Sequence, residues 1–306
     1  MKTSALHLHE LAESVLAVPP LARQADMSIA EAPNRRLIKH IEAGGIRTLL
    51  YGGNANLYHM PLREYPALLD LLADAAGPQT RVIPSVGPDF GKMIEQAPML
   101  RDSGYQTAMV LPMQGLSTSE GVAEGIARFV DIAGIPVTLY IKSEQYIDLD
   151  RLERLVADGL VLCVKYAIPR SDPDTDPFLQ AMLERISVQR VVSGMGERPV
   201  LSHVGRFGMA SFTTGSGCIA PNSCSALLRA LQGSDMASAQ PLHARFLPLE
   251  TLRDSVSLIR VLHDAVSLCG IADMGPQLPL LSASPAEMMG QIEATARRLL
   301  ASETAA

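Results

Sequence analysis

One lysine lies inside a run of residues that otherwise predicts a buried strand. The run is LVLCVKYAIP, from Leu160 to Pro169, and the lysine is Lys165. Burying a charged amine is costly, and a buried lysine commonly responds with a lowered pKa. A neutral amine near pH 7 can attack a ketone and form a Schiff base, whose iminium weakens the neighbouring C–H and C–C bonds. The alternative is a structural lysine whose stem is buried and whose amine reaches water.

A tyrosine on the preceding predicted strand is placed to work with this lysine. In residues 135–141 the odd positions are apolar and are expected to face helices, which turns Thr138 and Tyr140 the other way. If Lys165 also points inward, its amine meets the phenol of Tyr140 near the ends of adjacent strands. Tyr140 is then a candidate proton carrier. The alternative is a core tyrosine with a hydrogen-bonded hydroxyl.

Adjacent glycines follow an earlier predicted strand, in the segment YGGNANLYHM at 51–60. Glycine lets backbone approach a ligand closely, and the N–H groups of Gly53 and Asn54 could bind a carboxylate. Asn54 and Asn56 could contact substrate hydroxyls. The simpler interpretation is a tight turn that requires unusual backbone angles.

No motif indicates a metal or a nucleotide cofactor, and we expect none. The histidine spacing lacks a metal-ligand pattern at a strand end, and no glycine-rich phosphate motif is present. The acidic stretch SDPDTDP at 171–177 lacks the glycine and the terminal glutamate of a calcium loop, so a solvated turn is expected. A net charge of −6 argues against nucleic-acid binding.

Composition and patterning favour a cytoplasmic protein with a large core. The chain is 47% apolar and 19% charged. No segment approaches the roughly 18 uninterrupted apolar residues of a membrane span, so no membrane partner is expected. The N-terminus lacks the apolar core of a signal peptide, and the four cysteines form no CxxC pair.

Strand-like and helix-like segments alternate through the first 232 residues. Eight such repeats predict parallel strands with covering helices, and they fit a closed (β/α)8 TIM barrel better than an open sheet. Strands are predicted at Ser14–Val18, Thr48–Tyr51, Arg81–Val86, Thr107–Leu111, Pro136–Ile141, Leu160–Tyr166, Arg190–Ser193 and Met209–Thr213. Helices between them are predicted at Asn34–Ala43, Pro61–Ala76, Lys92–Asp102, Ser117–Ala133, Asp148–Asp158, Pro177–Ser187 and Arg198–Phe207.

Strand signals stop after Pro221, and only helices are predicted beyond it. These lie at Asn222–Leu231, Ser234–Phe246, Leu252–Leu268 and Pro285–Ala301. We therefore expect a barrel over residues 1–232 and a C-terminal helical bundle over residues 233–306.

Four landmarks, in order, resemble the dihydrodipicolinate synthase / N-acetylneuraminate lyase family of class I aldolases and dehydratases. They are GGNANLYHM at 52–60, VTLYIKSEQ at 137–145, VLCVKYA at 161–167, and SGMG followed by GMASFTTGSGCIAP at 208–221. The resemblance implies a barrel with a C-terminal helical extension and a homotetramer. It also implies that Lys165 forms the imine, that Tyr140 relays protons, and that Gly53 and Asn54 hold the carboxylate of a 2-oxo acid such as pyruvate.

The chain also departs from the pattern of the synthases. Gly53 and Asn54 stand where they have threonines, and Gln145 replaces an arginine five residues after the tyrosine. Met113 and Gln114 replace a tyrosine pair, and SGMG lacks an acidic pair. The departures disfavour dihydrodipicolinate synthesis.

We therefore expect a Schiff-base lyase, aldolase or dehydratase, that acts on a 2-oxo acid of the 2-keto-3-deoxy sugar acid class. Gln145 is kept as a substrate-binding candidate. One alternative is a sugar-acid binding protein with little turnover on the same barrel. A metal-dependent class II aldolase is disfavoured by the missing ligands.

Overall fold

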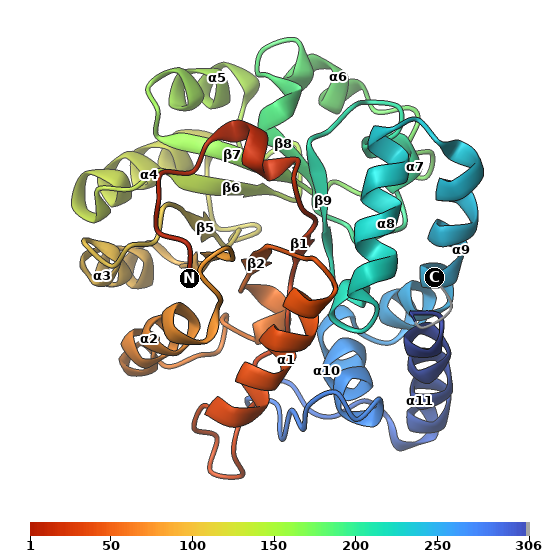
Figure 1. Ribbon diagram of the computed structural model, residues 1–306. Coiled ribbons are helices and arrows are strands. Elements are labelled where there is room, and N and C mark those ends of the chain that lie inside the picture. Colours follow the sequence, from red (N-terminus) through yellow and green to blue (C-terminus); the bar gives the residue numbers. More distant parts are fainter. Residues whose placement is uncertain (304–306) are drawn as a thin grey trace.

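Nine short parallel strands form the centre of the fold, with helices around them (Figure 1). The structure is a computed structural model that describes residues 1–303. The strands are β1 (Leu16–Ala17), β2 (Thr48–Leu50), β3 (Arg81–Ile83), β4 (Ser85–Val86), β5 (Ala108–Val110), β6 (Val137–Ile141), β7 (Val161–Tyr166), β8 (Val191–Ser193) and β9 (Ser211–Thr214).

The sheet closes into a barrel through one interrupted strand. The order of neighbours is β3-β2-β1-β9-β8-β7-β6-β5-β4. The two ends of this order, β3 and β4, are separated in the chain only by Pro84, which has no N–H to donate to a sheet ladder. The predicted barrel of eight strand–helix units is therefore confirmed, with its third strand divided in two.

The helices lie outside the barrel and, toward the C-terminus, beside it (Figure 1). They are α1 (Glu31–Ala43), α2 (Tyr65–Ala75), α3 (Phe90–Leu100), α4 (Ser119–Ala133), α5 (Leu149–Ala157), α6 (Pro177–Leu183), α7 (Val200–His203), α8 (Pro221–Gln232), α9 (Met236–Ser255), α10 (Leu258–Leu268) and α11 (Ala286–Ala301). Local sequence fixes many of their ends. For α4, the Thr118 hydroxyl caps the N-terminus by accepting from the Gly121 N–H, and Gly134 ends the helix with a φ of 71°.

Four helix predictions were wrong in their bounds. The predicted helices at Ser234–Phe246 and Leu252–Leu268 divide elsewhere, because α9 continues to Ser255 and α10 begins after Ser257, whose side chain caps it. The helix α9 runs through two prolines, and its packing on α8, α10 and α11 compensates for the backbone bonds that they remove. The helix predicted at 198–207 is helical only over α7, and the one predicted at 61–76 begins with a 3-10 turn before α2.

The chain turns from α8 into α9 at the boundary predicted between residues 232 and 233, since Gly233 ends α8 and Asp235 caps α9. Whether the two parts are separate domains stays a prediction, and residues 304–306 of the second part lie outside the described residues. Within residues 1–303, no helix is both long and apolar enough to cross a membrane.

A band of small polar side chains crosses the inside of the barrel on three neighbouring strands. The hydroxyls of Thr107 and Thr138 are 3.2 Å apart, and the Thr138 hydroxyl is also 3.2 Å from the Cys163 sulfur. All three residues are buried. Two residues further along β6 and β7, on the same side of each strand, stand Tyr140 and Lys165. This alternation turns both side chains toward the interior at the carboxyl end of the barrel.

The solvated turn predicted at 171–177 is wrong at one residue, Asp176, because this side chain is buried. Asp176 is fully buried and caps α6 by accepting the Leu179 N–H at 3.0 Å. It also accepts from the Tyr166 hydroxyl at 2.5 Å and from Arg170 at 2.8 Å. Tyr166 directly follows Lys165, so this cluster holds the end of β7 against α6.

Replacing Asp176 with Ala should lower the free energy of unfolding by about 3 kcal/mol, because it leaves the Tyr166 hydroxyl and the Leu179 N–H without their buried acceptor. Urea unfolding followed by circular dichroism measures this. The matched control is Asp174→Ala in the same stretch, whose partly exposed pair with Arg206 at 3.3 Å contributes little. Equal effects of the two substitutions would contradict the structural role of Asp176.

Candidate active site

Lys165 and Tyr140 meet at the carboxyl ends of β7 and β6. They are direct partners in the parallel register of the two strands. The Lys165 amine lies 4.1 Å from the centroid of the Tyr140 ring. The contact that strand alternation predicted is therefore confirmed. Gly194 leaves the space for it, since a Cβ at that position would lie 2.8 Å from Cγ of Lys165.

Lys165 is a buried amine without a counter-ion. It is 6% exposed, and among residues 1–303 it has neither an ion pair nor a hydrogen bond. Burial lowers its pKa to about 7, and the positive charges of Lys142 and Arg253 act in the same direction. The tyrosine ring favours the ammonium by about 2 kcal/mol at a desolvated site, which is less than the effect of burial on an isolated charge. A large fraction of the amine is therefore neutral at pH 7.

Three phenols lie near one another at this end of the barrel. Burial raises the pKa of Tyr140, and Tyr58 raises it further. Burial and Tyr58 act in the same way on the pKa of Tyr146, and burial raises that of Tyr58 itself. All three therefore stay protonated and can donate. Sequence reasoning did not single out Tyr58 or Tyr146, although each follows a barrel strand, where site residues gather.

The loop after β2 forms a 3-10 turn, Gly53–Ala55, that begins at the glycine pair. The side chains of Met109 and Ser85 pack closely on Gly52, since a Cβ there would lie 2.7 Å from Cε of Met109 and 2.9 Å from Oγ of Ser85. At Gly53 the nearest atom would be 3.6 Å away, so space remains on that side. The first hydrogen bond of the turn is donated by the Ala55 N–H, and the N–H groups before it have no acceptor within the turn.

The two asparagines of the loop have different surroundings. The side chain of Asn54 donates to the Val18 carbonyl at 2.9 Å, so it ties the loop to the end of β1. Asn56 is buried in the left-handed conformation with a φ of 57°. Its amide donates weakly to the Leu278 carbonyl at 3.4 Å, and its Oδ1 has no partner among the described residues. Asn56 therefore keeps a free acceptor.

Gln145 is exposed and borders a cavity of about 140 Å³ beside the end of β6. The cavity is lined by Pro112, Met113, Gln114, Gly115, Ser117, Lys142, Ser143, Gln145 and Tyr146. Lys142 was not singled out from the sequence. Its position in the sequence could have identified it, because it lies two residues after Tyr140 and continues the inward-facing positions of β6.

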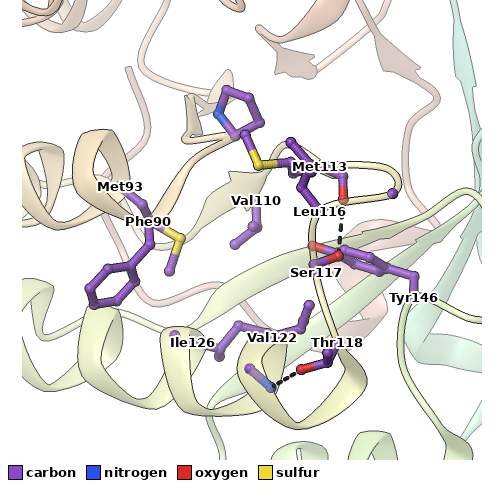
Figure 2. A pocket seen from close by; sticks show the side chains of 14 residues that line it. Phe90, Met93, Val110, Met113, Leu116, Ser117, Thr118, Val122, Ile126 and Tyr146 are labelled. Carbon is purple, nitrogen blue, oxygen red and sulfur yellow. Dashed lines mark hydrogen bonds between the residues drawn. The ribbon is translucent and has the colours of Figure 1, made fainter.

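A second, more apolar cavity of about 460 Å³ lies between α3 and α4 (Figure 2). Phe90 and Met93 line it from α3, and Val122 and Ile126 line it from α4. Tyr146 and Ser117 border both cavities, so the loops after β5 and β6 separate the polar space from the apolar one.

A buried acid lies beyond Lys165, in the loop after β8. Glu197 accepts from the Thr214 hydroxyl, and its Oε2 has no partner among the described residues. Burial and, to a smaller extent, the neighbouring Glu250 raise its pKa to about 8. Glu250 is also buried and accepts from Arg253 at 2.6 Å. Glu197 therefore carries a proton at neutral pH, while Glu250 and Arg253 form an ion pair.

Within residues 1–303, no three histidine, cysteine, aspartate or glutamate side chains are grouped so that they could hold a metal ion.

A model of the dihydrodipicolinate synthetase family matches residues 14–298 of the chain. The chain belongs to this family. The family consists of class I Schiff-base lyases, and the protein is a lyase of this type. The resemblance that the four sequence landmarks suggested is thereby confirmed.

The relatives include synthases and an aldolase. A 4-hydroxy-tetrahydrodipicolinate synthase of Corynebacterium urealyticum is 24% identical over 226 residues, which are 72% of this chain and 73% of that protein. The dihydrodipicolinate synthase of Bacillus clausii has the same fold with a TM-score of 0.83 at 19% identity, covering 97% of this chain and 100% of that one. The sialic acid aldolase of Ruminococcus gnavus gives a TM-score of 0.82 at 13% identity, covering 96% and 99%.

Replacing Glu197 with Gln should change how stability depends on pH. Above the ordinary glutamate pKa of 4.5, folded Glu197 holds a proton that the unfolded chain releases, so its contribution to stability falls until about pH 8. The amide does not titrate. Relative to the wild type, the variant should therefore gain up to about 1.4 kcal/mol per pH unit between these values.

Urea unfolding at several pH values from about 5 to 8 measures this difference. The control is Glu293→Gln, which alters a half-exposed glutamate of α11 whose pair with Arg297 lies at the surface. Parallel stability curves for the wild type and the Glu197 variant would contradict a buried, protonated Glu197.

Proposed function

We propose that the protein is an aldolase or dehydratase that forms a Schiff base between Lys165 and a 2-oxo acid, with 2-keto-3-deoxy sugar acids as its substrate class. The observation that carries the proposal is the buried amine of Lys165, which has no counter-ion and lies against the Tyr140 ring. An amine in that state is a nucleophile near pH 7. A structural lysine would reach water or pair with a carboxylate.

The reaction begins when the neutral amine of Lys165 adds to the C2 carbonyl. Loss of water gives an iminium, which draws electrons from C3 and from the C3–C4 bond. The phenol of Tyr140 carries protons for these steps. The phenol first gives a proton to the hydroxyl that leaves as water when the iminium forms. The resulting phenolate then takes a proton from C3 in a dehydration, in which the C4 hydroxyl leaves as water, or from the C4 hydroxyl in a retro-aldol cleavage, in which the C3–C4 bond breaks and an aldehyde leaves. The enamine is common to both routes, and water releases the keto product from Lys165.

The loop after β2 supplies contacts to the rest of the substrate. We assign the substrate carboxylate to the backbone N–H groups of Gly53 and Asn54, which precede the first hydrogen bond of the turn. The free Oδ1 of Asn56 is suited to accept from a substrate hydroxyl. Gln145, at the edge of the polar cavity, is the candidate for contacts further along the substrate.

The proposed substrate differs from that of the synthases in the family. Gly53, Gln145 and Met113 stand at positions where the synthase pattern has a threonine, an arginine and a tyrosine, which speaks against dihydrodipicolinate synthesis. A solved relative, a prophage protein of E. coli K12, is a complex with pyruvate; it has a TM-score of 0.79 at 17% identity, covering 94% of this chain and 98% of that one. That complex supports a 2-oxo acid as the ligand class.

A binding protein with little turnover is the second candidate, and the altered loop at Gly53 and Asn54 favours it. The homotetramer and the cytoplasmic location stay predictions.

Borohydride reduction in the presence of pyruvate tests the proposed function. We expect a permanent adduct of one pyruvate per chain, located on Lys165 by peptide mass spectrometry, because hydride reduces the imine to a stable amine. Lys165→Met is the control and should show no adduct. If the wild type gains thermal stability with pyruvate but shows no adduct, the protein binds its ligand without imine chemistry.

Replacing Tyr140 with Phe separates imine formation from turnover. Imine trapping should stay largely intact, whereas product release from a 2-keto-3-deoxy acid should slow by roughly 10²-fold or more, the usual effect of losing a positioned proton carrier. A coupled assay for pyruvate or semialdehyde measures the turnover. Near-normal turnover would remove Tyr140 from the mechanism.

A further inference from the structure

A second lysine approaches the phenol that Lys165 contacts. The Lys142 amine lies 5.9 Å from the centroid of the Tyr140 ring, and the Lys165 amine lies 4.1 Å from it. Lys142 immediately follows Ile141, the last residue of β6, on the same side of the chain as Tyr140. The distance between the two amines is therefore one that a short carbon chain can span.

Lys142 has no anionic partner of its own. It is half-buried, and among residues 1–303 no carboxylate or carbonyl oxygen bonds to its amine. The nearest carboxylate in sequence, Glu144, is taken by Arg170 at 2.6 Å. By contrast, the half-buried Lys92 donates to the carbonyls of Leu57 and Met60 at 3.0 and 3.1 Å. A lysine amine that has no acceptor within its own chain is typical of a site that binds an anionic ligand.

The cavity beside Lys142 is polar enough to complete such a site. Its walls include the side chains of Gln114, Ser143 and Gln145, all of which can donate hydrogen bonds. Its volume of about 140 Å³ suits one end of a ligand rather than a whole substrate. The positive charge of Lys142 also acts on Lys165. The imine formed at Lys165 is itself a cation, so a second anionic group on the ligand would balance the charge.

We propose that Lys142 binds a negatively charged group at the distal end of the substrate, so that the preferred 2-oxo acids carry a carboxylate or a phosphate there. The inference rests on the proposed function, because the imine at Lys165 fixes the other end of the ligand. The preference among 2-oxo acids is then determined by Lys142, Gln145 and Ser143. The imine chemistry is performed by Lys165 and Tyr140.

Imine trapping with matched 2-oxo acids tests this proposal without requiring turnover. The probes are 2-oxoglutarate and 2-oxopentanoate, which share a carbon chain and differ in the terminal carboxylate, and 2-oxo-4-phosphonobutanoate, which carries a phosphonate. The readout is the concentration of each acid that half-saturates the borohydride adduct on Lys165. Trapping is done at about pH 9, because removing the charge of Lys142 raises the pKa of Lys165.

In the wild type, the anion-terminated acids should half-saturate at concentrations roughly 10- to 100-fold lower than 2-oxopentanoate. Lys142→Met should abolish this preference, read as the ratio of the half-saturating concentrations of 2-oxopentanoate and 2-oxoglutarate, in which any change at Lys165 that is common to both acids cancels. Lys142→Arg should keep it, and Lys39→Met, which alters an exposed lysine of α1, should have no effect. A stronger preference for either the phosphonate or the dicarboxylate identifies which anion the site accepts.

Equal half-saturation by 2-oxoglutarate and 2-oxopentanoate in the wild type would overturn the role of Lys142, as would a preference that survives in Lys142→Met. Pyruvate distinguishes this failure from that of the proposed function. Normal pyruvate trapping without any anion preference overturns the inference alone, whereas the absence of a pyruvate adduct in every variant overturns the proposed function.

Discussion

One uncharged amine inside the barrel is the feature on which the proposed chemistry depends. The Lys165 side chain is 6% exposed and has no carboxylate partner in residues 1–303. Desolvation and two neighbouring cations act together on it, and only the ring of Tyr140 acts in the opposite direction. A paired lysine would be more stable as an ammonium, and it would not be a nucleophile. The lack of a counter-ion is therefore what makes the amine reactive.

The rest of the fold holds this amine in place without neutralising it. Gly194 supplies the space beside the lysine stem, and the buried Asp176 fixes the end of β7 one residue further on. Two buried acids of the interior do not pair with this amine. Glu250 is paired with Arg253, and Glu197 carries a proton at neutral pH. The buried carboxyl groups of Glu197 and Glu250 therefore leave the amine of Lys165 unpaired.

Short-range patterns predicted the barrel and the meeting of Tyr140 with Lys165, because strand alternation repeats every two residues and strand–helix alternation specifies parallel strands. The surroundings of the site could not be predicted in this way. Glu197 contacts residues of α9 about fifty positions later in the chain, and Asn56 contacts the carbonyl of Leu278. The continuation of α9 through two prolines likewise depends on its neighbours. Lys142 lies one residue beyond the end of β6, and the cavity that it borders is formed with the loop after β5, which the pattern of one strand does not predict.

The most direct test is a titration of Lys165 in the ligand-free protein. The rate of acylation of this one amine by acetic anhydride can be followed against pH by peptide mass spectrometry, with a lysine peptide as the internal reference. We expect the acylation rate of Lys165 to reach half of its maximum near the lowered pKa of about 7. Half-maximal reactivity at the ordinary lysine value of 10.5 would contradict it, because the amine would then be charged at neutral pH.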